Sequence, residues 1–221
     1  MRGSNNPDYF GIITGSVTGP IGTYVQIQSS GYPLGSFYVY QQVYDEKGKP
    51  VEGLYADRND DGLITERDRY HFQKTAPDIL IGIWSNLQYA NWDFSFSGRI
   101  SLGNYVYNNV NSLSAFNRLY STQVFLSNIS TSVYSSGFEL PQYLSDYYIE
   151  DASFCKIDFL SLGYSFRNIW KDKLNFRISL NAQHAFTLTK YSGQDPEVAD
   201  GLDGYSYPLS RTFSIELAAE F

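Results

Sequence analysis

Arg211-Thr-Phe-Ser-Ile-Glu-Leu-Ala-Ala-Glu-Phe221 is a segment in which apolar and polar side chains alternate up to position 221. One set comprises Phe213, Ile215, Leu217, Ala219 and Phe221, and the other comprises Thr212, Ser214, Glu216 and Glu220. Successive side chains of a strand point to opposite faces, so this pattern predicts a strand with one apolar face. An aromatic at the end suits a membrane-interface girdle, which favours a membrane-barrel strand over a half-buried strand of a soluble sheet.

The composition suits strands and excludes one class of partner. The 221 residues suffice for one domain or two small ones. Aromatic residues make up 17%, whereas charged residues make up only 18%, and aromatics are enriched both in strands and in membrane-interface belts. A net charge of -7 argues against nucleic acid, because a phosphate partner needs a basic surface.

Five further stretches are predicted to be strands from alternation or from their position between turn signals. They are residues 36–44, 79–89, 92–96, 154–166 and 174–186. Short bends at 31–35, 90–91 and 167–173 alternate with long connections at 45–78, 104–153 and 187–210. Transmembrane barrels combine brief periplasmic turns with longer outer loops, so we expect an all-β, antiparallel transmembrane β-barrel portion of about six to eight strands with long extracellular loops. No helix is predicted, and residues 108–128 are expected to form an irregular surface loop.

The membrane prediction does not depend on helices. No run of about 18 apolar residues occurs, so no transmembrane helix is expected, and a mean hydropathy of -0.31 is compatible with alternating barrel strands. Residues 1–7 lack the apolar stretch of a secretory signal. We therefore expect the chain to be the downstream part of a longer protein or to begin with an added leader. Residues 1–30 are left without an assigned role, and residues 31–221 are assigned to the barrel portion.

Residues 57–68 match a twelve-residue calcium loop. The expected ligands are the side chains of Asp57, Asn59, Asp61, Thr65 and Asp68 and the backbone carbonyl of Leu63. Calcium needs six to eight oxygens, so the loop has to wrap the ion, and Gly62 at the sixth position allows the sharp bend. Asp68 replaces the usual bidentate Glu, which implies weaker Ca²⁺ binding or tolerance of Mg²⁺.

The surroundings of this loop favour a structural role for the cation. Tyr55 precedes the loop and Pro77 follows it, so the flanking amphipathic helices of a calcium sensor are missing. A bound ion would neutralise the three Asp side chains and hold the segment together. An empty turn rich in Asp and Asn is the alternative interpretation.

Several stretches resemble one known family. They are Gly31-Tyr-Pro-Leu-Gly-Ser-Phe-Tyr38, residues 57–69, Lys74-Thr-Ala-Pro77, Asn91-Trp-Asp-Phe94, Tyr107-Asn108, Glu150-Asp-Ala-Ser-Phe154, Leu162-Gly-Tyr164, Thr189-Lys-Tyr-Ser-Gly-Gln-Asp-Pro-Glu-Val198 and Phe221. In order and spacing they are similar to the C-terminal portion of the SusC-like, TonB-dependent outer-membrane transporters of Bacteroidetes-type bacteria. Val39, where a glycine is frequent, and residues 183–186, where Asn-Leu-Phe is common, depart from the family pattern.

The resemblance implies a nutrient importer of the outer membrane. Family members form a barrel of roughly 22 strands, plugged by an N-terminal domain and energised by TonB. A SusD-like surface lipoprotein covers the barrel over a glycan or, in some members, a peptide. The implied partners are therefore outer-membrane lipid, a SusD-like lipoprotein and, through an N-terminal part expected upstream, the TonB complex. Oligosaccharides are the expected solute, and this chain alone could not import them.

No enzyme is predicted. His71 and His184 are the only imidazoles, and neither has a spacing that suggests a metal pair or a nucleophile's base. Cys155 is the only cysteine, so it cannot form an internal disulfide, and we interpret it as a packed strand residue. Acid pairs such as Glu150 with Asp151, or Asp195 with Glu197, are interpreted as loop structure.

Two other classes stay open from the residues alone. One is a small outer-membrane barrel of about eight strands that closes on itself, and the other is a soluble, calcium-dependent carbohydrate-binding β-domain. Tyrosines of the long loops could stack on sugars, although packing or partner contact is the simpler interpretation, and none is named as a ligand residue. They are Tyr105, Tyr107, Tyr120, Tyr134, Tyr143, Tyr147 and Tyr148.

Overall fold

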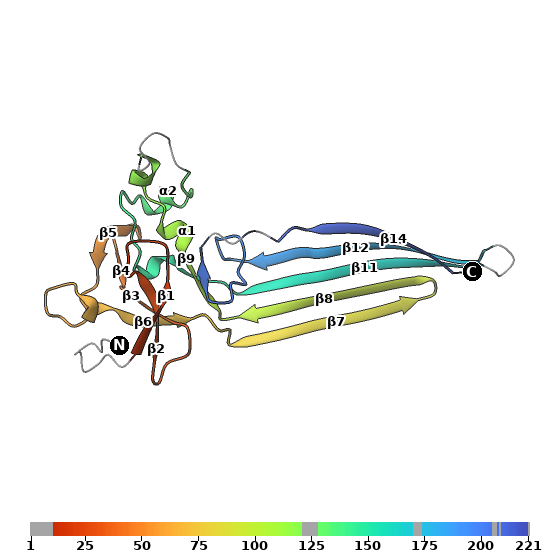
Figure 1. The fold of residues 1–221 in the computed structure, drawn as a ribbon, viewed down its shortest axis with the longest axis horizontal. Coiled ribbons are helices and arrows are strands. Elements are labelled where there is room, and N and C mark those ends of the chain that lie inside the picture. Colours follow the sequence, from red (N-terminus) through yellow and green to blue (C-terminus); the bar gives the residue numbers. More distant parts are fainter. Residues whose placement is uncertain (1–10, 121–127, 170–173, 205–206, 208, 221) are drawn as a thin grey trace. The chain divides into compact units, whose positions relative to one another are not determined.

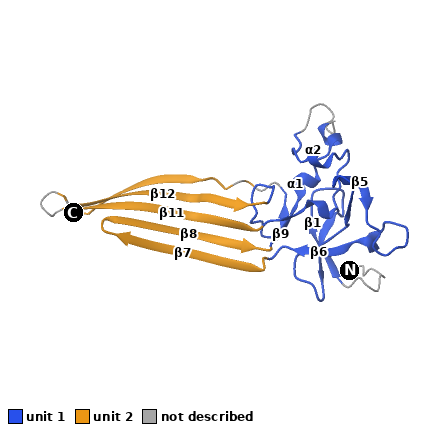
Figure 2. Cartoon of the chain, turned by 180° about the vertical axis from the view of Figure 1, so that it is seen from behind, with its two compact units in different colours: residues 1–76, 104–152, 191–206 blue, residues 77–103, 153–190, 207–221 orange. Residues whose placement is uncertain are grey.

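A computed structural model describes residues 11–120, 128–169, 174–204, 207 and 209–220. The chain divides into two compact units (Figure 2). Unit 1 is drawn from residues 1–76, 104–152 and 191–206, and unit 2 from residues 77–103, 153–190 and 207–221. The three long connections expected from the sequence therefore fall almost entirely in unit 1, which is a folded body with its own sheets.

Unit 2 is one antiparallel sheet of five long strands (Figure 1). In sheet order they are β14 (Thr212–Glu220), β12 (Leu174–Thr189), β11 (Phe154–Asn168), β8 (Trp92–Leu102) and β7 (Ile79–Tyr89). β7 and β8 are joined by the two-residue bend that the sequence predicted, in which Ala90 has a positive φ of 54°. A positive φ at the first position of such a bend matches the twist of the strands it connects.

The sheet of unit 2 has an apolar face and a polar face. On β14 the apolar face carries Phe213, Ile215 and Leu217, whose side chains are 75%, 69% and 63% exposed. This face continues across the strands, because Ile215 pairs with Leu180 and Leu160 with Phe96. Nothing in unit 2 covers these side chains among the described residues. The predicted all-β, antiparallel barrel portion is confirmed, and its apolar residues gather on one face of the sheet.

The sheet of unit 2 is open over the described residues. β14 pairs with β12 alone, and β7 pairs with β8 alone. The small self-closing barrel required a pairing between an early strand and the last one, and the described residues contain no such pairing. In a larger barrel, each of these two edge strands would pair with a further strand.

Unit 1 is built from short strands in three small sheets. The first contains β1 (Gly11–Ser16), β2 (Tyr24–Ser29), β3 (Ser36–Val39) and β6 (Tyr70–Lys74), the second β4 (Gln42–Tyr44) and β5 (Pro50–Tyr55), and the third β10 (Ile149–Asp151), β9 (Tyr105–Asn108) and β13 (Leu202–Asp203). Its helices are single turns: α1 (Asn109–Ser112), α2 (Val133–Ser136) and the 3₁₀ turns η1 (Glu66–Asp68), η2 (Phe116–Tyr120) and η3 (Asp146–Tyr148). No helix among the described residues has the length and apolarity needed to cross a membrane.

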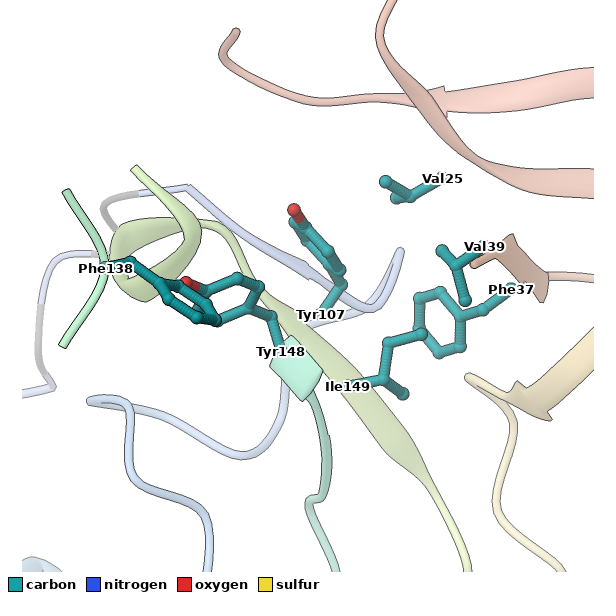
Figure 3. Packing of buried hydrophobic residues seen from close by; sticks show 7 residues of the cluster. All are labelled: Val25, Phe37, Val39, Tyr107, Phe138, Tyr148 and Ile149. Carbon is teal, nitrogen blue, oxygen red and sulfur yellow. The ribbon is translucent and has the colours of Figure 1, made fainter. Parts of the chain in front are cut away.

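The core of unit 1 gathers side chains from distant parts of the chain (Figure 3). Its buried members are Val25, Phe37, Val39, Tyr107, Phe138, Tyr148 and Ile149. Burying one such side chain contributes about 1.5–3 kcal/mol, so this cluster is a substantial source of stability for unit 1.

The structure corrects the sequence analysis in three places. Residues 36–44 are two strands, and all four residues of β3 are buried, so this segment lies inside unit 1 and is not a membrane strand. Over the described residues the long-strand sheet consequently has five strands, fewer than the six to eight expected. Residues 11–29, left without a role, form the β1–β2 hairpin. Residues 108–115 are no surface loop, because Asn109 and Ser112 are buried, while 121–127 lie outside the described residues.

Candidate functional site

The loop of residues 57–68 is a run of tight turns held by its own acidic and amide side chains. The Gly62 amide donates to Asp57 Oδ2 at 2.7 Å, and the Asp61 amide donates to Asn59 Oδ1 at 3.0 Å. The Leu63 amide donates to Asp61 Oδ1 at 2.9 Å. Gly62 adopts a φ of 80°, which a side chain would disfavour. The first three predicted ligand side chains are therefore brought together within one loop.

Asp68 anchors the two ends of this loop. Its carboxylate is fully buried and accepts hydrogen bonds from the backbone amides of Arg58 at 2.9 Å and Thr65 at 2.8 Å. Thr65 in turn caps η1. The hydrogen bond from the Thr65 backbone amide, together with those from the other backbone donors, holds the pKa of the Asp68 carboxyl below its usual range. Asp68 thus closes the loop through backbone contacts.

The fit of a cation to these residues is partial. The described residues contain no cluster of three His, Cys, Asp or Glu side chains arranged for a metal ion. Asp57 Oδ1 is buried without a hydrogen-bond partner in the described part of the chain, which fits an oxygen reserved for a cation. The Thr65 hydroxyl accepts from the Arg67 amide at 3.3 Å. A ligand role for the six predicted residues stays a prediction.

A half-buried carboxylate, Asp146, connects this loop to the rest of unit 1. Asp146 accepts from the Tyr70 hydroxyl at 2.7 Å and from the Gln42 amide at 2.9 Å. The Arg58 guanidinium lies over the Tyr70 ring, 4.3 Å from its centre. Burial raises the pKa of the Asp146 carboxyl, and burial together with the Asp146 hydrogen bond raises the pKa of Tyr70. Sequence reasoning missed this centre because its members lie up to 104 residues apart.

The polar face of unit 2 carries two bidentate ion pairs between strands. Arg177 of β12 contacts Asp93 of β8 at 3.0 and 2.6 Å, and Arg99 of β8 contacts Asp158 of β11 at 2.9 and 3.0 Å. The first pair spans β11 at Gly163, where an added Cβ would lie 2.5 Å from both partners. The absence of a side chain at Gly163 therefore leaves room for this ion pair across β11.

The residues considered for catalysis have structural surroundings. His71 stacks on Tyr32 with ring centres 3.4 Å apart, and burial lowers the pKa of its imidazole. Glu150 accepts from the Ser192 hydroxyl at 2.7 Å, and Asp195 accepts from the Glu197 amide at 3.0 Å. Cys155 is half-buried within β11. The Ser29 hydroxyl lies 3.3 Å from His71 Nε2, whereas His71 Nδ1, which a third group would have to orient in a catalytic triad, has no hydrogen-bond partner in the described part of the chain.

The loop tyrosines divide between core and surface. Tyr107 and Tyr148 are buried in the core of unit 1, which supports the packing interpretation for these two. Tyr134 is largely exposed, and the side chain of Tyr120 lies outside the described residues.

Known proteins similar to this chain are outer-membrane receptors. No model of a known protein family matches the sequence. The TonB-dependent receptor SusC of Bacteroides thetaiotaomicron is 41% identical over 229 residues, which cover 100% of this chain and 23% of that protein. The chain belongs to the SusC-like family of TonB-dependent receptors. TonB-dependent receptor P3 of Formosa agariphila, a second relative of this SusC-like chain, is 27% identical over 230 residues, covering 89% of the chain and 23% of the relative.

Solved structures support the same fold. The RagAB peptide importer in its open-open state superposes on this SusC-like chain with a TM-score of 0.67 and 17% identity, covering 98% of the chain and 25% of the importer chain. In its closed-closed state the TM-score is 0.65 at 20% identity, covering 89% and 24%. The SusC-like chain thus spans about a quarter of its relatives. TonB-dependent receptors are outer-membrane, non-enzymatic proteins, so the predicted location is confirmed.

Proposed function

We propose that this SusC-like chain is part of the barrel wall of a TonB-dependent importer that takes up oligosaccharides together with a SusD-like surface lipoprotein. The observation that carries the proposal is the exposed apolar face of the five-stranded sheet, which suits hydrocarbon, in a chain 41% identical to SusC. The polar face opposite, with its paired charges, suits a water-filled or plugged interior. The partners, TonB coupling and solute come from the family.

The proposal is tested in the full-length receptor with its lipoprotein in bacterial cells. Uptake is measured for a panel of neutral oligosaccharides, namely maltoheptaose, xylohexaose and a fructo-oligosaccharide, and for the peptide pentaalanine. We expect uptake of at least one sugar, lost when the proton gradient is collapsed and strongly reduced without the lipoprotein. Energised uptake of pentaalanine with no uptake of any sugar would replace oligosaccharide by peptide as the solute. Peptide is the second candidate because the structural relatives are named as peptide importers.

We also propose that residues 57–68 bind Ca²⁺, with Mg²⁺ bound more weakly. Support comes from the turns that gather Asp57, Asn59 and Asp61 and from the unpartnered oxygen of Asp57. The Leu63 carbonyl and Thr65 would complete the oxygen set, and the ion would offset repulsion between the carboxylates. Its role would be to hold unit 1 in its folded form.

The calcium proposal has a separate experiment. Limited proteolysis at residues 55–70 of the purified receptor is compared with Ca²⁺ and with chelator. We expect calcium to protect this segment, and Asp57→Ala combined with Asp61→Ala to remove the protection. Asp60→Ala is a poor control because Asp60 has a positive φ of 57°, so Asp60→Asn is used, since Asn tolerates that conformation. Equal cleavage with and without calcium in the unaltered protein would refute the site.

A further inference from the structure

The sheet of unit 2 contains a bulge at the centre of β11. Ile157 pairs with Gly98 of β8, whereas Phe159 pairs with Ser97, so Asp158 is an extra residue with no partner in the β8 register. The same irregularity occurs towards β12, where Phe186 faces Ile157 and Gln183 faces Phe159. β-bulges re-aim side chains and are enriched beside functional sites.

The bulge changes which residues of β11 face the polar side. Before it, Ile157 lies on the apolar face, and after it Leu160 and Leu162 pair with the apolar-face residues Phe96 and Phe94. Phe159 falls on the other face, in the row of Ser97. Without the extra residue, Phe159 would share the face of Ile157, two positions away. The bulge therefore turns one aromatic ring onto the polar face.

A second aromatic ring borders the same serine. Trp84 of β7 pairs with Ser97 from the opposite side and is 74% exposed, whereas its neighbours Ile83 and Leu87 belong to the apolar face. β7, β8 and β11 are consecutive in the sheet (Figure 1). Neighbouring strands lie about 4.8 Å apart, so Trp84 and Phe159 are separated by roughly 10 Å with only a small side chain between them. We call these three residues the Ser97 slot.

Polar groups lie in the rows on both sides of the Ser97 slot. On one side is the Arg99–Asp158 ion pair, and Lys156 of β11 pairs with Arg99, so this side carries two cations and one carboxylate. On the other side, Asn86 pairs with Ser95, and Ser95 with Ser161. The slot thus combines two aromatic rings with flanking amide, hydroxyl and ionic groups.

We propose that the Ser97 slot binds one sugar ring of the oligosaccharide as it passes along the barrel wall. The C–H faces of a sugar ring match the aromatic faces of Trp84 and Phe159, and its hydroxyl groups match the flanking donors and acceptors. This inference rests on the proposed import function and adds a binding site on the polar face.

The experiment measures sugar binding to the full-length receptor purified with its lipoprotein. The oligosaccharide panel and pentaalanine are titrated by calorimetry against the unaltered protein, Trp84→Ala and Phe159→Ala. Each alanine variant removes one of the two stacking rings, so it should bind the sugar about tenfold more weakly. Trp84→Phe should keep most of the affinity because it retains a ring. Leu87→Ala, on the apolar face of the same strand, is the matched control and should bind as the unaltered protein does.

The outcomes separate the Ser97 slot from the import function. If the unaltered receptor binds a sugar and Trp84→Ala and Phe159→Ala bind it equally well, the slot is refuted while import stands. If it binds pentaalanine and no sugar of the panel, both the slot and the proposed solute fail. A heat-dependent gel shift of each variant checks barrel assembly, and Trp84→Phe supplies the decisive comparison should an alanine variant fail to assemble.

Discussion

The two units use the same kinds of apolar residue in opposite ways. In unit 1, Val25, Phe37 and Tyr107 are completely buried, whereas in unit 2, Phe213, Ile215 and Leu217 are mostly exposed. A soluble protein rarely exposes a continuous apolar face of this extent. The contrast is between a unit with its own buried core and a unit whose exposed apolar face suits a surrounding apolar medium.

The polar residues differ between the units in a parallel manner. In unit 1, the Asp68 carboxylate is buried and the Asp146 carboxylate is half-buried, and both accept hydrogen bonds that fix loops. In unit 2, the ion pairs Arg177–Asp93 and Arg99–Asp158 are partly exposed and link strands across one face. The stability of unit 1 should therefore fall when single buried groups are removed. In unit 2, the effect of a substitution on stability should depend on the face of the sheet on which it is made.

The largest effect is expected in the core of unit 1. Phe37→Ala should destabilise unit 1 by about 3–5 kcal/mol, because it removes a completely buried ring and leaves a cavity. Leu34→Ala, at a neighbouring and largely exposed position, should change stability by about 0.5 kcal/mol or less. Hydrogen exchange of unit 1 amides in the assembled receptor measures both. Similar hydrogen exchange in the two variants would contradict the claim that unit 1 is stabilised by its own buried core.

A charge on the apolar face of unit 2 should have the next largest effect. Ile215→Arg should cost about 2–4 kcal/mol near the bilayer midplane, since it places a cation in hydrocarbon. Ser214→Arg, one residue away on the polar face, should cost little. Urea-dependent folding into lipid vesicles reports the difference. Equal costs at positions 214 and 215 would contradict the assignment of the two faces.

Asp68 should contribute a pH-dependent stabilisation to the 57–68 loop. Asp68→Asn removes the charged acceptor of the Arg58 and Thr65 amides and should weaken the loop by about 1.5–3 kcal/mol in chelator, measured by local hydrogen exchange. Because the folded pKa is lowered, the stabilisation is complete above the unfolded value of about 3.9 and is lost as the pH falls through the folded pKa. Asp60→Asn is the control. If the 57–68 loop of Asp68→Asn stayed less stable than that of Asp60→Asn by the same amount at the lowest pH, the pH-dependent role of Asp68 would be contradicted.

The smallest predicted effect concerns the gap at Gly163. Gly163→Ala should displace the Arg177–Asp93 pair, whose atoms lie 2.5 Å from the added Cβ, at a cost of about 1 kcal/mol. Gly82→Ala is the matched control, because a Cβ at Gly82 meets nothing within 4 Å and that residue also lies in a strand of unit 2. Vesicle folding of both variants provides the measurement. An equal cost would mean that the ion pair does not depend on Gly163.

Local alternation predicted the strands of unit 2 well. β7 begins and ends at the predicted residues 79 and 89, because its periodicity and the following bend are both local signals. β8 runs on to Leu102, beyond the predicted residue 96, since its length is set by pairing with β7 and β11. Residues 36–44 were wrongly assigned to the membrane sheet because a strand-forming segment after a turn does not reveal which sheet it joins.

Parts of the candidate site depend on contacts that a single sequence does not reveal. The Arg177–Asp93 pair joins residues 84 apart, and the partners of Asp146 come from distant strands of unit 1. The bulge did leave a signal: the apolar residues Cys155 and Ile157 are odd-numbered, whereas Leu160 and Leu162 are even-numbered. A change of phase within a predicted strand could therefore have located Asp158 and the turned Phe159.

The most direct test is a comparison of adjacent residues of β14 in a lipid bilayer. Spin labels at position 215 and position 214 of the assembled receptor are probed with oxygen, which concentrates in hydrocarbon, and with a water-soluble nickel complex. The account predicts that oxygen dominates relaxation at position 215 and that it does not at position 214. Equal oxygen and nickel accessibility at the two positions would contradict the claim that the apolar face of unit 2 contacts lipid.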